Sequence, residues 1–238
     1  MANFPFQRLQ VDLAALIERT PAGSRLISEP DLAKQLGVSR ATLREAMRTF
    51  ETQGLIRRRQ GSGTFVVGKV PVMDAGLEVL ESLDTMARRL NLAVTVSDLN
   101  VEQIDAEEEH ANGLGVAVRS CLTRISRVMR TETRPVAYLI DTLPDVILKI
   151  ADLPKGFNGS VLDFLLERGD DLRISRAAIS ATNATAEVAK ALEIQRGDVL
   201  LQFISQLYTA DGKIVDFSTS YFIPGYFHFH VNRRVGTN

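Results

Sequence analysis

Arginines gather in one short segment near the N-terminus of this chain, and their spacing suits contact with nucleic acid. Arg40, Arg44 and Arg48 recur at intervals close to one helical turn, and the run Arg57–Arg59 follows them. A guanidinium group can donate two parallel hydrogen bonds to guanine or to phosphate. A basic helix followed by a basic hairpin is therefore a candidate surface for double-stranded DNA.

Apolar spacing predicts three helices that would carry this surface. The first begins at Phe6 and ends at the segment TPAGS. The second begins at the cap Ser28 and ends at Gly37, and the third begins at the cap Ser39 and ends near Gln53. Two short helices joined by a glycine-containing turn form a helix-turn-helix. The side chains expected on the inner face of the third helix are Leu43, Ala46, Met47 and Phe50.

A glycine-punctuated hairpin follows the third helix. LIRRRQ and GTFVVG predict two strands around the turn QGSG, where Gly61 and Gly63 permit positive φ. Strand alternation leaves two possibilities: Arg57 and Arg59 face DNA together, or Arg58 does so alone. For one helix alone, a solvated basic face would be the better interpretation. Cap, turn, arginines and hairpin in this order favour a winged DNA-binding motif.

The segment LISEPDLAKQLGVSRATLREAMRTFETQGLIRRRQGSGTFV resembles the winged helix-turn-helix of GntR-type bacterial transcription regulators. The resemblance implies operator contacts from Arg40, Thr42, Arg44 and the wing glycine Gly61. Pro30 stands where many members have arginine, so one contact to DNA is expected to be lost. The full set of residues predicted to contact DNA is Ser39, Arg40, Thr42, Arg44, Arg48, Arg57, Arg59 and Gly61.

The composition indicates a globular chain whose two parts differ in charge. Of its 238 residues, 45% are hydrophobic and 24% are charged. Residues 1–70 hold eleven basic and six acidic side chains, whereas the remainder holds seventeen and twenty-three. The sequence has no apolar run of roughly 18 residues and no signal-peptide pattern, and its single cysteine cannot form an internal disulfide. These features predict a cytoplasmic protein without a membrane partner.

The remaining sequence predicts a second domain of α+β class. Residues 1–68 are assigned to the winged domain, 69–76 to a linker and 77–238 to the second domain. Two hairpins, SCLTRISRVMRTETRPVAYLIDTLP and DVLLQFISQLYTADGKIVDFSTSYF, predict an antiparallel sheet. Helices are expected at PDVILKIADL, SVLDFLLERGD and ATAEVAKALEI, packed on that sheet.

The sequence contains no recognisable catalytic constellation. It has no nucleophile elbow, nucleotide-binding glycine motif or Cys/His cluster with zinc spacing. His228 and His230 alternate with aromatic residues on the last strand, and with Asp216 they could hold a metal ion. Ordinary edge-strand residues are the favoured interpretation of this pair. We therefore predict no metal, no cofactor and no enzymatic activity.

The second domain resembles the UTRA effector domain of HutC-type GntR regulators, a fold shared with chorismate lyase. The resemblance covers about residues 77–234 and implies a small metabolite bound over the sheet. It further implies that Arg127, Ser160 and Asp216 contribute contacts to that metabolite.

This domain departs from the UTRA pattern at several polar positions. Met129, Leu139 and Phe222 stand where arginine, glutamate and tyrosine are expected, although Tyr221 is adjacent to the last. Asp84 stands where many members have serine or threonine, which makes it a poor neighbour for phosphate. These departures predict a less anionic, more apolar ligand, unless the same residues are sheet core. The residues predicted to bind the effector are Arg127, Ser160, Asp216, Tyr221 and Asp84.

These expectations combine into a ligand-gated transcription regulator, usually a repressor. It is expected to bind a palindromic operator as a homodimer, because one recognition helix covers only a half-site. Two alternatives stay open: a ligand-independent DNA-binding dimer, and a chorismate-lyase-like enzyme with a DNA-binding appendage.

Overall fold

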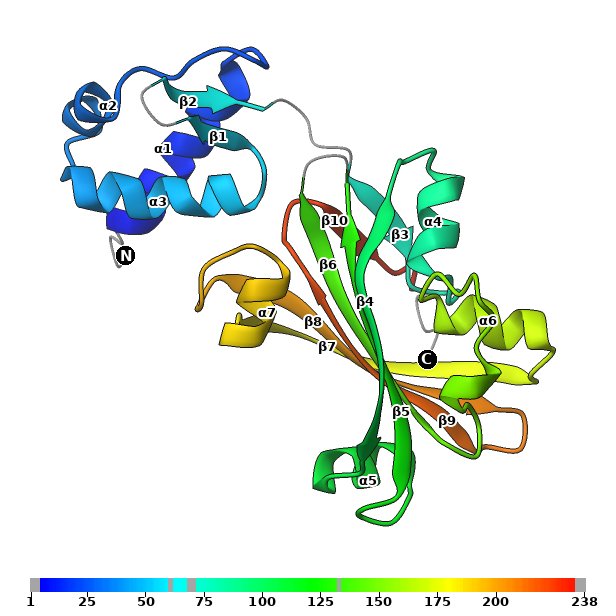
Figure 1. Cartoon of the computed structure of the whole chain (residues 1–238). Coiled ribbons are helices and arrows are strands. Elements are labelled where there is room, and N and C mark those ends of the chain that lie inside the picture. Colours follow the sequence, from blue (N-terminus) through cyan, green and yellow to red (C-terminus); the bar gives the residue numbers. More distant parts are fainter. Residues whose placement is uncertain (1–4, 60–61, 68–71, 132–133, 234–238) are drawn as a thin grey trace, which may run out of the picture. The chain divides into compact units, whose positions relative to one another are not determined.

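A computed structural model of the chain describes residues 5–59, 62–67, 72–131 and 134–233 (Figure 1). The chain divides into two compact units, Met1–Val72 and Met73–Asn238. Within the described residues, no helix has both the length and the apolar character needed to cross a membrane.

The first unit is a winged helix-turn-helix. Its elements are α1 (Pro5–Arg19), α2 (Glu29–Gln35), α3 (Arg40–Thr52), β1 (Ile56–Arg59) and β2 (Gly63–Val66). The predicted caps are confirmed: the Ser28 hydroxyl accepts a hydrogen bond from the backbone N–H of Asp31, and the Ser39 hydroxyl accepts one from Thr42. Gly37, at φ +67°, supplies the left-handed turn between α2 and α3.

The inner face of α3 is the one that the apolar spacing predicts. Leu43, Ala46, Met47 and Phe50 are all buried. They share one core with Leu9 and Leu13 of α1, Leu32 of α2 and Ile56 of β1. This core leaves the opposite side of α3, which carries the arginines, at the surface of the unit.

The second unit is built on a six-stranded antiparallel sheet in the order β4-β5-β6-β9-β8-β7. The strands are β4 (Thr95–Asp105), β5 (Cys121–Arg130), β6 (Pro135–Pro144), β7 (Leu172–Asn183), β8 (Val199–Thr209) and β9 (Ile214–Phe222). The helices are α4 (Leu83–Arg89), α5 (Glu108–Leu114), α6 (Val161–Arg168) and α7 (Ala186–Ala191). The α+β prediction is thus confirmed.

Helices cover both faces of this sheet (Figure 1). α6 packs on the face that carries Ile125, whereas α5 packs on the face that carries Leu122. α7 lies on the same face as α5, because Glu187 of α7 accepts a hydrogen bond from the Tyr138 hydroxyl. The two faces therefore offer separate environments to side chains that are neighbours in sequence.

A small parallel pair, β3 (Met73–Gly76) and β10 (Phe227–His230), lies beside the large sheet. β3 falls on residues that the sequence assigned to the linker, so that part of the assignment is corrected. Met73 and Ala75 are buried while Asp74 is exposed, which is the alternation of a strand with one covered face. β3 is too short for this alternation to be recognised from sequence alone.

The helix expected over PDVILKIADL does not form. The segment contains only a 3₁₀ turn, η1 (Ile150–Asp152). Leu148 is fully buried, and its carbonyl accepts a hydrogen bond from the Thr123 hydroxyl at 2.7 Å. That carbonyl bonds to the sheet instead of to a following helical turn.

Candidate nucleic-acid interface and ligand site

The first two turns of α3 present an exposed basic face. Arg40 is exposed, and 58% of the Arg44 side chain is accessible. At the start of the helix, Ser39 Oγ lies 2.8 Å from Thr42 Oγ1 and accepts from the Thr42 N–H at 3.1 Å. These two hydroxyls complete the helix cap, so Thr42 holds the N-terminus of α3 as well as facing solvent.

Arg44 is paired within its own unit. Its Nε donates to Oε2 of Glu29, at the start of α2, at 2.6 Å. Arg58 approaches the same place, because its Nη2 donates to the carbonyl of Arg44 at 3.0 Å and its Nε lies 3.4 Å from Glu51. The sequence did not predict Glu29 as a partner of Arg44, because fifteen positions separate the two residues.

The hairpin alternation separates the three wing arginines. Arg58 turns onto α2 and α3, so Arg57 and Arg59 project from the other side of β1. The guanidinium of Arg59 stands 5.3 Å from the ring centroid of Phe65, a cation–π contact. Of the remaining predicted residues, Arg48 pairs with Glu45 at 3.2 Å, and Gly61 lies outside the described residues.

Arg25 joins the wing, a role that was not predicted from its position in the sequence. Its backbone forms an isolated antiparallel bridge to Phe65. Its side chain passes so close to Gly63 that a Cβ on that glycine would lie 2.5 Å from the Arg25 Nε. Gly63 also has φ +109°, which disfavours any other residue. In the sequence, the only indication of this contact was the extended character of Arg25 and its neighbours before the second helix.

A cluster of charged residues lies under the N-termini of α4 and α6 in the second unit. Arg127 of β5 is only 7% exposed, and its Nη1 forms an ion pair with Asp141 of β6. Its Nε is buried and has no hydrogen-bond partner among the described residues. A buried donor without an acceptor is costly, so this nitrogen is an unsatisfied group that a further acceptor would stabilise.

Asp216 of β9 belongs to the same buried group. It accepts a hydrogen bond from the backbone N–H of Thr142 at 3.1 Å. Burial raises the pKa of Asp216 well above its ordinary value, and the neighbouring Asp141 carboxylate raises it further. The positive charge of Arg127 is therefore shared between two carboxyl groups.

Ser160 is bonded to its own helix. Its hydroxyl donates to Asp163 at 2.8 Å, and Ser82, which caps α4, donates to the same oxygen at 2.7 Å. Asp84 lies in the first turn of α4, and its pKa is raised. Burial is the largest cause; the charge of Arg127 opposes it, and the nearby Asp163 adds to it. Ser82, Asp141 and Asp163 belong to no recognisable sequence motif, and they were therefore not predicted as part of this site.

Tyr221 does not join this cluster. Residues on adjacent positions of β9 face opposite sides of the sheet, and Tyr221 stacks on Tyr138 with ring centroids 6.4 Å apart. Phe222 occupies the other face, where its ring packs against Phe203 and Phe227. The predicted effector set is therefore divided: Arg127, Asp216, Ser160 and Asp84 gather on one side, and Tyr221 lies on the other.

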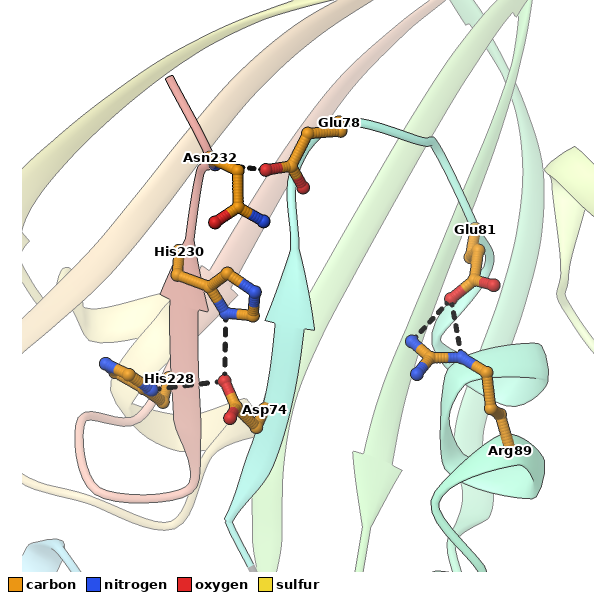
Figure 2. Close-up of polar contacts among 7 residues, drawn as sticks. All are labelled: Asp74, Glu78, Glu81, Arg89, His228, His230 and Asn232. Atoms are coloured by element: carbon orange, nitrogen blue, oxygen red, sulfur yellow. Dashed lines mark hydrogen bonds and ion pairs between the residues drawn. The ribbon is translucent and has the colours of Figure 1, made fainter. Parts of the chain in front are cut away.

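Asp216 is likewise not the partner of the two histidines on β10. Asp216 is buried in the large sheet, whereas His228 and His230 are exposed and both contact Asp74 of β3 (Figure 2). Asp74 and the histidines are 154 and 156 residues apart, so sequence spacing could not pair them.

Both units match known families. Residues 7–66 match the family described as bacterial regulatory proteins, gntR family, and residues 89–228 match the UTRA domain. The chain is 30% identical over 198 residues to the HTH-type transcriptional repressor NagR of Bacillus subtilis, covering 82% of this chain and 79% of NagR. It is 26% identical over 206 residues to the repressor MngR of Escherichia coli, the mannosyl-D-glycerate transport/metabolism system repressor, covering 84% of this chain and 82% of MngR.

A solved structure supports the fold. The structure of PhnF from Mycobacterium smegmatis matches 96% of this chain and all of its own with a TM-score of 0.65, at 20% sequence identity. At that identity the likeness concerns the fold alone. The two family matches and the 30% identity to NagR show the family: the chain belongs to the HutC-type branch of the GntR family and is a transcriptional regulator with an N-terminal DNA-binding domain and a C-terminal UTRA domain.

Proposed function

We propose that this regulator binds a palindromic operator as a homodimer, with the N-terminal turns of α3 in successive major grooves. The observation that carries the proposal is the exposure of Arg40 and Arg44 on the first two turns of a capped helix. Such a helix start offers guanidinium groups to guanine and backbone N–H groups to phosphate. Arg57, Arg59 and Arg25 extend the positive surface along the wing. Operator DNA implies a cytoplasmic site of action.

The edge strand β7 is the proposed surface for dimer formation. It stands at one end of the six-stranded sheet, and Ile174 and Ile179 on it are 65% and 46% exposed. An open edge with apolar side chains favours pairing with a second chain. We expect Ile179→Arg to shift the protein from dimer to monomer in multi-angle light scattering. An unchanged dimer mass would place the interface elsewhere.

The proposed effector is a small metabolite without a phosphate group. Four carboxyl groups, those of Asp84, Asp141, Asp163 and Asp216, outnumber the two cations near them, the buried Arg127 and the more exposed Arg88. A dianion would meet net repulsion there, whereas a polyol, an amide or an amine could use the free Nε of Arg127 as a donor and the carboxylates as acceptors. MngR is named for mannosyl-D-glycerate, a sugar derivative, and sugars are therefore among the first compounds to test.

The proposed mode of action is repression that the effector relieves. A coupling of about 1–3 kcal/mol between the sites would change operator affinity roughly 5- to 150-fold. A thermal-shift screen of sugars, amino acids and amines, each alongside its phosphorylated form, tests the effector class. We expect the neutral or cationic member of a pair to raise the Tm by several degrees. Preference for the phosphorylated member would overturn the assignment.

An operator-binding assay separates gating from the two simpler alternatives. A compound found in the screen should change operator affinity in fluorescence anisotropy. No change with a bound compound would indicate ligand-independent DNA binding. We expect no pyruvate release when the purified protein is given chorismate; release would identify the lyase activity that the UTRA fold also permits.

A further inference from the structure

Two histidines and one aspartate converge on the exposed side of the small parallel sheet (Figure 2). Nδ1 of His228 lies 3.1 Å from Oδ1 of Asp74, and Nδ1 of His230 lies 3.0 Å from the same oxygen. One candidate ligand atom from each of the three residues lies within 4.8 Å of the others. From these observations we propose that Asp74, His228 and His230 form a binding site for a divalent transition-metal ion of the zinc class.

The backbone brings these ligands together. His228 and His230 are two residues apart on β10, so both side chains leave the same face of the strand. The parallel register places Asp74 directly opposite His228 and Gly76 directly opposite His230. The spacing and the strand pairing, rather than chance meeting of long side chains, fix the three groups near one point.

The distances already suit a metal. Zinc binds imidazole nitrogen and carboxylate oxygen at about 2.0–2.2 Å, so neighbouring ligand atoms stand roughly 3–3.5 Å apart. The two nitrogen–oxygen separations of 3.0 and 3.1 Å match this spacing. The side chains of Asp74, His228 and His230 are 59%, 69% and 44% exposed, so an ion can enter from solvent and water can complete its coordination.

A fourth group supports the site from outside. A Cβ on Gly76 would collide with the Glu78 carboxylate and would lie 3.5 Å from Nε2 of His230, so both groups stand beside this glycine. Glu78 also accepts a hydrogen bond from the backbone N–H of Asn232, which holds its carboxylate in place. A carboxylate that accepts from the far nitrogen of a ligating histidine fixes the ring and raises its basicity, and this is the role that the proposal assigns to Glu78. Two carboxylates and two neutral imidazoles carry the charge that balances a divalent cation.

The donor set selects the class of ion. Imidazole nitrogen favours zinc, copper, nickel and cobalt, whereas magnesium and calcium prefer sites made of oxygen alone. Binding would link β3, the first strand of the UTRA unit, to β10, its last strand. The metal site and the effector cluster have no residue in common. The inference therefore does not depend on the proposed function.

Titration of the full-length protein with zinc chloride tests the site. The protein is first treated with a chelator and desalted, and binding is followed by isothermal titration calorimetry. We expect one equivalent of Zn²⁺ per chain with a micromolar or tighter Kd. Loss of an outer-shell partner of a metal typically weakens affinity 10–100-fold, so Asp74→Asn and His228→Gln, which remove ligands, should weaken binding at least about tenfold.

Matched variants exclude binding elsewhere. His110→Gln removes the third histidine of the chain, which lies on α5, and Cys121→Ser removes the single thiol; neither should change the Kd. Glu78→Gln should weaken binding less than Asp74→Asn. Magnesium should give no heat of binding at the same concentrations. Absence of stoichiometric zinc binding to the wild type, or equal affinity in wild type and Asp74→Asn, would overturn the proposal. The thermal unfolding curve of each variant checks that the fold is intact.

Discussion

Nε of Arg44 in the recognition helix lies 2.6 Å from Oε2 of Glu29 in the preceding helix. The strongest candidate for base contact is thus held by a carboxylate of its own domain when DNA is absent. The Arg44 side chain keeps 58% of its surface exposed, so it can reach a duplex by exchanging this partner. An exposed pair of this kind contributes about 0.2–1 kcal/mol, which DNA phosphates and bases can replace.

Removing Glu29 should therefore strengthen DNA binding while making it less selective. In Glu29→Gln, Arg44 and Arg58 lose a shared carboxylate, and the positive potential over α3 rises. We expect a roughly two- to fivefold gain in affinity for any duplex, which corresponds to the energy of an exposed ion pair. Fluorescence anisotropy with operator and random duplexes measures both effects. Asp12→Asn, the same change of charge on an exposed part of α1, is the control and should have less effect.

Salt dependence should reveal which arginines contact phosphate. The logarithm of the affinity falls linearly with the logarithm of salt concentration, and each lost phosphate contact lowers the slope by about one. We expect Arg40→Ala and Arg59→Ala each to lower the slope by that amount. Arg58→Gln should lower it less, because Arg58 is bound to Glu51 and to the carbonyl of Arg44. A larger effect of Arg58 than of Arg59 would reverse the assigned facing of the wing.

Gly159 should be required for the position of Arg127. It has φ +94°, and a Cβ there would lie 2.5 Å from Cδ of Arg127. We expect Gly159→Ala to lower the Tm by several degrees and to abolish the response to the effector, with DNA affinity unchanged. Gly156→Ala is the matched control, because its Cβ would meet nothing within 4 Å. Equal effects of the two variants would show that Gly159 does not act by positioning Arg127.

The buried carboxyl of Asp216 should impose a pH dependence on stability. Its pKa in the folded state is raised, mainly by burial, so the stabilisation is complete below the unfolded pKa of about 3.8 and is lost as pH rises through the folded value. We expect the Tm of Asp216→Asn, relative to wild type, to rise between pH 4 and neutral pH. Each unit of raised pKa corresponds to about 1.4 kcal/mol.

Asp211→Asn supplies the opposite sign as a control. The hydrogen bond from Thr209 lowers the pKa of Asp211, so its stabilisation is present above the unfolded pKa and is lost as pH falls. The Tm of Asp211→Asn, relative to wild type, should therefore fall as pH rises. Differential scanning fluorimetry across the pH series measures both variants. Parallel curves for the two would contradict the assigned shifts.

Local signals made the winged unit predictable. Ser28, Ser39 and Gly37 mark helix ends by capping and by positive φ, and these depend on a few adjacent residues. The apolar positions of α3 then fix which side faces the core. Most of the hairpins of the second unit follow equally from short-range alternation and tight turns.

Contacts between distant segments could not be predicted in the same way. Asp74 meets His228 only because the first and last strands of the unit pair in parallel, and nothing in either segment specifies the other. The division of Tyr221 from Phe222 depended on register, in which a shift of one residue exchanges the two faces. The helix predicted around Leu148 does not form, because the Leu148 carbonyl accepts a hydrogen bond from Thr123, which is another contact between separate segments.

If the exposed arginines of α3 bind operator DNA, removing one of them must weaken the affinity for the operator. Operator sequences are first selected by the wild-type protein from a pool of random duplexes. Arg44→Ala is then compared with Arg196→Ala, which removes an exposed arginine of the other unit that lies outside the proposed dimer surface. We expect Arg44→Ala to weaken operator binding by about 1–3 kcal/mol, roughly 5- to 150-fold, and Arg196→Ala to leave it unchanged. Equal operator affinities for wild type and Arg44→Ala would contradict the claim.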